Sequence, residues 1–201
     1  MSAAVTVRRP VLADAIPGAL LRDVALVAAA VLVVAATAQI RIELPFTPVP
    51  LTGQTFGVLL VGAALGPARG AIALVAYLLV SLGLPFYAGG ESGAQVWYGA
   101  SAGYLAAFPI AAALIGRMAR AGHDRSVVGT LAAFLLASLV VLAGGALWLH
   151  LGLGMPAVQA VQQGVVPFLV GDLLKALLAA GLLPGAWRLL GRAGDHPPAR
   201  G

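Results

Sequence analysis

Residues 127–149 read VVGTLAAFLLASLVVLAGGALWL, an unbroken run of 23 residues without Asp, Glu, Lys or Arg. As a helix, such a run is long enough to cross the roughly 30 Å hydrocarbon core of a bilayer. The rest of the chain shares this character, because 61% of its 201 residues are hydrophobic and only 9% are charged. An ordinary soluble domain carries roughly a quarter charged residues. The sequence therefore predicts an all-α integral membrane protein.

Five further apolar segments surround this run, which predicts a six-transmembrane-helix bundle formed as a single membrane domain. The six segments are Val24–Ile40, Thr52–Leu65, Gly70–Leu84, Gly103–Met118, Val127–Leu149 and Val165–Leu190. The second and third are short for a bilayer, so flanking residues must contribute or the adjoining loops must dip into the bundle. We place an N-terminal segment at 1–22, the bundle at 23–190 and a tail at 191–201.

The arginines predict the orientation of the bundle, because cytoplasmic loops retain positive charge during insertion. Those on one side of the predicted bundle are Arg8, Arg9, Arg22, Arg69, Arg117, Arg120, Arg125, Arg188, Arg192 and Arg200. The loops on the opposite side contain only Arg41. Both termini are therefore expected in the cytoplasm, with the loops at 41–51, 85–102 and 150–164 facing outward. The arginines at segment ends also serve as simple topology determinants.

The first two outward loops have a composition suited to covering a ligand. The first contains three prolines between residues 45 and 50, which restrict its backbone. Candidate ligand contacts from the two loops are the aromatic residues Phe46, Tyr87, Trp97 and Tyr98. Aromatic rings also form belts at membrane interfaces, so each ring taken alone allows either interpretation. Together, the stiff and aromatic loops predict a structured lid over an external pocket.

Two charges lie inside the last apolar segment, where each costs roughly 2.5–3.5 kcal/mol. Asp172 and Lys175 have a spacing of three residues, so they share one helix face and can neutralise each other. Lys175 is the only lysine in the chain. If the helix enters from outside near residue 165, the two lie about 10 and 15 Å along its axis, within reach of the loops. They predict a ligand site; the alternative is an ion pair that only fixes helix packing.

Neutral groups at the start of the second segment complete the candidate site. Gln54 and Thr52 could supply a donor and an acceptor to the same cavity, although Thr52 could equally cap the helix. Arg41, in the first outward loop, is a candidate partner for an anionic part of the ligand.

Several function classes are excluded or made improbable by what the sequence contains. The net charge of +5 does not indicate nucleic-acid binding, because the basic residues punctuate apolar runs instead of clustering on one face. There are no cysteines, and the three histidines lack metal-ligand spacing. No Gly-x-x-x-x-Gly-Lys-Ser/Thr motif for ATP occurs. Residues 99–103 match Gly-x-Ser-x-Gly around Ser101, but no histidine is evidently placed to serve it. We expect no catalytic residue, no metal and no cofactor.

The most distinctive stretches are PFTPVPLTGQTFGVLL at 45–60, LGPARG at 65–70 and PFLVGDLLK at 167–175. Through these, and through shorter matches at 83–85, 88–90 and 103–104, the chain resembles the biotin-specific S components of energy-coupling factor (ECF) transporters, the BioY family. The resemblance covers about Ile40 to Leu190. Some family members have a polar residue where this chain has Ala88-Gly89-Gly90.

The resemblance implies a six-helix S component of the bacterial cell membrane with an external biotin site. Its partners would be a transmembrane T component and cytoplasmic ATPases, which use the ATP. It implies that Asp172 and Lys175 contact biotin, and that Ala25, Ala29 and Ala30 resemble the family's Ala-x-x-x-Ala docking face. Small residues at this spacing let helices approach closely. Whether the chain also associates with itself stays open.

The biotin chemistry leaves two arrangements. Asp172 could accept from a ureido N–H, while Lys175 could donate to the ureido carbonyl or pair with the tail carboxylate. In the first case, Arg41 becomes the candidate for the tail. The alternative function is a small ion- or proton-coupled carrier that uses Asp172 and Lys175 as a relay.

Overall fold

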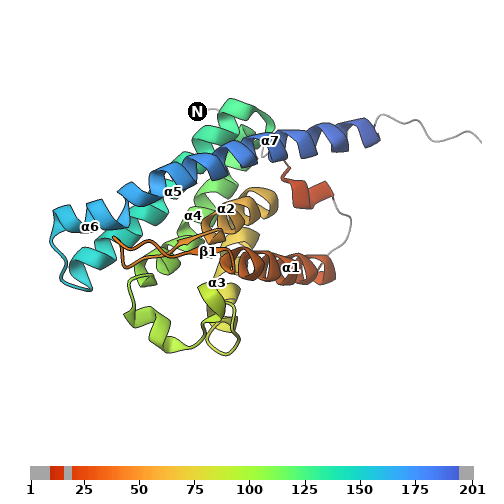
Figure 1. The fold of residues 1–201 in the computed structure, drawn as a ribbon. Coiled ribbons are helices and arrows are strands. Elements are labelled where there is room, and N and C mark those ends of the chain that lie inside the picture. The colour runs from red at the N-terminus through yellow and green to blue at the C-terminus, as the bar shows by residue number, and fades with distance from the viewer. Residues whose placement is uncertain (1–9, 16–19, 195–201) are drawn as a thin grey trace, which may run out of the picture.

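A computed structural model of the chain describes residues 10–15 and 20–194. Its main helices are α1 (Leu20–Ala38), α2 (Gln54–Leu65), α3 (Pro67–Val80), α4 (Ala102–Arg120), α5 (Val127–Leu151), α6 (Ala157–Gly164) and α7 (Leu169–Gly194). Helix α4 lies at the centre, packed against α2, α3 and α5. Figure 1 shows α1 and α7 on opposite flanks of these inner helices, and α1 contacts α2 and α3 while α7 contacts α5. The predicted terminal segments 1–22 and 191–201 lie partly outside the described residues.

The prediction of a helical membrane fold is confirmed. Four helical stretches are long and apolar enough to cross a membrane: 20–38, 102–120, 127–151 and 157–190. The other two predicted segments form α2 and α3, with 12 and 14 residues. At 1.5 Å per residue they are about 18 and 21 Å long, which is less than the hydrocarbon core. The sequence had marked these two segments as short for the same reason.

The turn between α2 and α3 consists of a single glycine. Gly66 has φ of 82°, a conformation that side-chain-bearing residues rarely adopt. Its N–H bonds to the carbonyl of Gly62, and Pro67 then starts α3. Since the turn takes no further residues, the two short helices follow each other directly beside α4.

Close approach of the helices depends on small residues. A Cβ added at Gly62 would lie 2.7 Å from the Cα and O atoms of Ala112 on α4, nearer than real Cβ contacts allow. Ala111 and Ala112 are fully buried. On α1, Ala25 and Ala29 are exposed, whereas Ala30 is buried in the bundle. Of the three residues expected to form a docking face, only the first two are therefore accessible to a partner in this arrangement.

The outward loops contain more regular structure than the sequence indicated. The first forms a two-stranded antiparallel ladder of β1 (Arg41–Ile42) and β2 (Leu51–Thr52), with Arg41 opposite Thr52. Its tip reaches α6, where the Thr47 hydroxyl donates to the Gln163 carbonyl at 2.7 Å. Short 3₁₀ turns are η1 (Leu12–Ala15), η2 (Ala88–Gly90), η3 (Ala94–Tyr98), η4 (His123–Arg125) and η5 (Val166–Phe168).

Helix α6 is the main element that the sequence reading missed. Its eight residues, AVQAVQQG, lie in the predicted outward loop 150–164. Because four of the eight are Gln or Gly, the segment is less hydrophobic than a membrane span, and a prediction based on apolar runs leaves it as loop. It packs against the end of α5 and supports the tip of the first loop.

Candidate functional site

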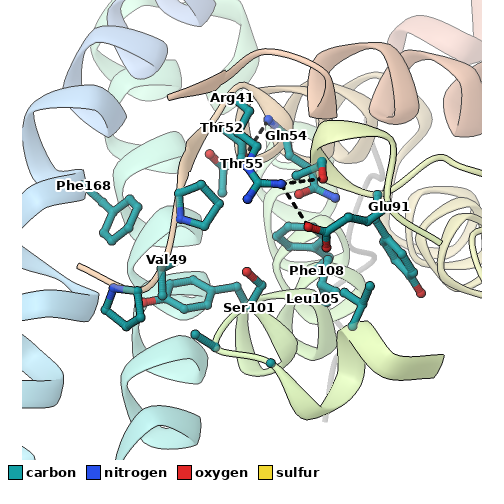
Figure 2. Close-up of a pocket in the computed structure, with 18 of the residues that line it drawn as sticks. Arg41, Val49, Thr52, Gln54, Thr55, Glu91, Ser101, Leu105, Phe108 and Phe168 are labelled. Atoms are coloured by element: carbon teal, nitrogen blue, oxygen red, sulfur yellow. Dashed lines mark hydrogen bonds and ion pairs between the residues drawn. The ribbon is translucent and has the colours of Figure 1, made fainter. Parts of the chain in front are cut away.

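A cavity of about 430 Å³ lies between the two outer loops and the ends of α2, α4, α5 and α7. This volume falls within the roughly 300–1,000 Å³ typical of small-molecule pockets. Figure 2 shows the cavity with Val49 and Thr52 from the first loop, Leu105 and Phe108 from α4, and Phe168 before α7. The wall is thus mainly apolar, and a few polar side chains project into it.

The charged pair predicted from the sequence forms one wall of this cavity. Lys175 Nζ donates to Asp172 Oδ1 at 3.1 Å and to the Thr55 hydroxyl at 2.6 Å. The Asp172 side chain is only 4% exposed and that of Lys175 only 16%. The second carboxylate oxygen, Asp172 Oδ2, is buried without a hydrogen-bond partner. A buried carboxylate oxygen that lacks a partner is costly, so Asp172 Oδ2 is an unsatisfied acceptor in the wall of the cavity.

Gln54 presents an acceptor to the same cavity, and its orientation is set by the residue behind it. Gln54 Nε2 donates to the Tyr77 hydroxyl at 2.7 Å, and that hydroxyl donates to the Phe86 carbonyl at 2.8 Å. A hydroxyl has a single proton to donate. Because Tyr77 gives its proton to Phe86, it can only accept from Gln54. This fixes the amide with Nε2 towards Tyr77 and leaves Oε1 free.

Arg41 lies on the loop side of the cavity and holds the two outer loops together. Its Nη1 donates to the Ala88 carbonyl at 3.1 Å and to Glu91 at 3.0 Å (Figure 2). Its Nη2 pairs with Glu43 at 3.1 Å, while its Nε is buried without a partner. Both glutamate partners are more than half exposed, so this end of the cavity is open to water.

Not all predicted site residues meet at the cavity. Those that line it are Asp172, Lys175, Gln54, Thr52, Tyr87 and Arg41. Thr52 also accepts the backbone N–H of Gln54 at 3.3 Å, although the N-cap position of α2 is Gly53; a contact of Thr52 with a ligand stays a prediction. Phe46 and Tyr98 are 60% and 79% exposed and do not line the cavity. Trp97 lies behind it, with its indole N–H donating to the Tyr87 hydroxyl at 3.0 Å.

Thr55 and Phe168 are among the lining residues that were not singled out from the sequence. Thr55, which accepts from Lys175, follows Gln54 directly in the stretch 45–60. Phe168 lies in the stretch 167–175, and its ring lies 5.9 Å from that of Tyr104. The signal in these cases was membership of the two most distinctive stretches, although the sequence did not indicate which side chains would face the cavity.

Ser101, considered as a hydrolase nucleophile, does line the cavity. However, no histidine is among the described residues that line it. The ring of His150 is engaged with the Met155 carbonyl, and that of His123 with the Met118 carbonyl. The described site therefore lacks the base that a serine nucleophile requires.

The model of the BioY family matches residues 5–192 of this chain. This chain belongs to the BioY family. The BioY chain is 36% identical over 181 residues to the biotin transporter BioY of Rhizobium etli, a match that covers 86% of this chain and 92% of the relative. It is 38% identical over 159 residues to the probable biotin transporter BioY of Pyrococcus horikoshii, covering 79% and 91%.

A solved structure has the same fold as this BioY chain. It is the crystal structure of the S-component for biotin from an ECF-type ABC transporter, with a TM-score of 0.75 and 27% identity. The match covers 84% of this chain and 92% of that one. The BioY chain is therefore a membrane-embedded member of a transporter family and not an enzyme, which removes the hydrolase alternative.

Proposed function

We propose that this chain is the substrate-binding S component of an ECF-type biotin uptake system, and that biotin occupies the cavity between the outer loops. The observation that carries the site assignment is the buried, unpartnered Asp172 Oδ2 beside Lys175. Family membership and the biotin-named relatives support the ligand.

The polar groups of the cavity match the ureido head of biotin in number and in kind. That head has two N–H donors and one carbonyl acceptor. The cavity offers two free acceptors, Asp172 Oδ2 and Gln54 Oε1. Lys175 has three N–H donors, of which two are engaged, so one remains for the ureido carbonyl. The apolar bicycle would pack against Phe108 and Phe168.

The tail carboxylate then extends towards Arg41. Arg41 is the only arginine among the residues that line the cavity in the described part of the chain, and its Nε has no partner. Its present carboxylate partners are exposed side chains, which a ligand carboxylate can displace. Phe46, Trp97 and Tyr98 do not line the cavity and are left out of the proposed contact set.

We further propose the membrane arrangement that the arginine pattern predicts, with six spans and both termini in the cytoplasm. The short helices α2 and α3 would count as two of the six. Energy for uptake comes from a partner T component and cytoplasmic ATPases. The exposed Ala25 and Ala29 on α1 are the proposed docking positions for the T component, whereas the buried Ala30 is not.

Calorimetry on the detergent-purified chain tests the assignment. Biotin is expected to bind at one site per chain, dethiobiotin to compete because it keeps the ureido group, and riboflavin not to compete. Asp172→Asn should weaken binding by roughly 10- to 100-fold, since a hydrogen bond to a charged acceptor is worth about 1.5–3 kcal/mol. A folded wild-type protein that binds no biotin would overturn the proposal and leave the ion-coupled carrier as the alternative.

A further inference from the structure

A second recess lies at the other end of α7, about 20 Å along the helix axis from Asp172. It has a volume of about 450 Å³ and is lined by Arg125 from η4 and by Pro184, Trp187, Arg188 and Leu190 from α7. None of these residues takes part in the biotin cavity. Two arginines and a tryptophan thus surround an open recess where α7 meets the turn between α4 and α5.

The Arg125 guanidinium is held in place without being neutralised. Its carbon lies 4.3 Å from the centroid of the Trp187 ring, and its Nη2 donates to the Pro10 carbonyl at 3.2 Å. The ring is in turn fixed, because Trp187 Nε1 donates to Asp124 Oδ2 at 2.6 Å. Within the described residues, no carboxylate oxygen lies within 4.0 Å of a nitrogen of Arg125 or Arg188.

The neighbouring acid, Asp124, forms no ion pair within 4.0 Å with Arg125 in the described part of the chain. Asp124 is only 2% exposed, and burial raises the pKa of its carboxyl, an effect that the Trp187 hydrogen bond only partly offsets. Arg125 has five N–H donors, of which one is engaged. An anion that entered the recess would therefore meet free donors of the preoriented Arg125 and a second cation, Arg188.

The surroundings of the recess are apolar. The recess itself includes the side chains of Pro184 and Leu190, the latter 41% exposed, and Val127 and Val128, which follow Arg125 by two and three residues at the start of α5, are 52% and 77% exposed. Tryptophan is enriched at membrane–water interfaces, and basic pockets between transmembrane helices bind the headgroups of anionic lipids. A soluble anion would use the arginines but not these exposed aliphatic side chains.

We propose that this recess binds the phosphate headgroup of an anionic phospholipid, with the acyl chains along the exposed aliphatic residues of α5 and α7. Arg125 and Arg188 contact the phosphate, and Trp187 positions Arg125. This site is independent of the biotin assignment. In the proposed orientation it lies in the cytoplasmic leaflet, but the contacts themselves do not depend on that orientation.

Native mass spectrometry of the full chain released from detergent, with phosphatidylglycerol or phosphatidylcholine added, tests the proposal. The wild type is expected to retain phosphatidylglycerol in preference to phosphatidylcholine. Arg125→Gln and Arg188→Gln should each weaken retention of phosphatidylglycerol by roughly fivefold. Arg117→Gln is the matched control, because Arg117 is an exposed arginine in the last turn of α4 that does not line the recess.

The outcomes separate a specific site from general charge. Equal losses in the Arg117 variant and the two recess variants would overturn the proposal, as would unchanged retention in both recess variants. Displacement of the lipid by millimolar inorganic phosphate would also overturn it, because the recess would then hold a free anion. The Tm of the same variants in detergent should match that of the wild type, which confirms that they are folded without relying on biotin binding and keeps this test separate from the proposed function.

Discussion

The charged pair on α7 gives the sharpest test, because removing one partner should harm the protein more than removing both. In Asp172→Asn, the Lys175 ammonium keeps only neutral partners inside the bundle, among them Thr55 at 2.6 Å. In Lys175→Met, a carboxylate whose side chain is 4% exposed loses the only cation paired with it among the described residues. Breaking a buried pair in this way costs about 3–5 kcal/mol, whereas replacing both charges by neutral groups of similar size is often close to neutral.

For a chain of this length, that cost corresponds to a fall in apparent Tm of roughly 6–20 °C for each single variant. The double variant, Asp172→Asn with Lys175→Met, should unfold at a higher temperature than either single variant. Intrinsic tryptophan fluorescence during heating in detergent measures all four proteins. A double variant less stable than both singles would refute the reasoning, because it would show that the two charges contribute independently.

Biotin calorimetry on the same set separates packing from recognition. All three variants should lose most of their affinity, including the double variant that remains stable. If the stable double variant bound biotin as tightly as the wild type, the pair would serve helix packing alone, and the proposed contacts of Asp172 and Lys175 would be wrong.

Three further predictions concern positions outside the pair. Tyr77→Phe removes the hydroxyl that orients Gln54 and should weaken biotin binding in calorimetry by roughly 3- to 10-fold; unchanged affinity would contradict the fixed orientation of the amide. Gly62→Ala should lower the free energy of unfolding by about 1–3 kcal/mol, measured as a lower Tm, because the added Cβ would lie 2.7 Å from the backbone of α4. The control Gly181→Ala should not lower Tm, because the space around Gly181 is open. Burial raises the pKa of Asp124 above its ordinary 3.8. The protonated carboxyl therefore contributes to stability below pH 3.8, and this contribution is lost as pH rises through the folded-state pKa. Asp124→Asn should flatten the change of Tm with pH over this window, and an unchanged slope would contradict the shift.

The sequence was most informative where one property dominates over many residues. Long apolar runs predicted the four membrane-length helices, with ends displaced by a few residues; the last helix, for example, begins at Leu169 instead of 165. The isolated charges Asp172 and Lys175 identified the polar wall of the cavity for the same reason, since a charge inside an apolar helix has few explanations.

Irregular loops were less predictable, because no periodicity relates neighbouring side chains there. Tyr87 and Tyr98 come from the same aromatic-rich loop, yet Tyr87 is 1% exposed and lines the cavity while Tyr98 is 79% exposed. The difference depends on contacts with distant residues: the Tyr87 hydroxyl donates to the Leu78 carbonyl on α3 at 3.0 Å. The sequence of the loop alone does not contain that information.

The distribution of charge in the cavity argues for a ligand that enters head first. Lys175 and Asp172 already neutralise each other, so a neutral ureido group can occupy the buried end without adding net charge there. A carboxylate at the same depth would leave an excess negative charge inside the bundle, which is expensive. At the loop end, by contrast, Arg41 is flanked by exposed carboxylates and by water, and exchanging one carboxylate partner for another costs little. The free energy of charge burial thus favours the ureido head at α7 and the tail at Arg41, which resolves the two arrangements that the sequence left open into one proposal.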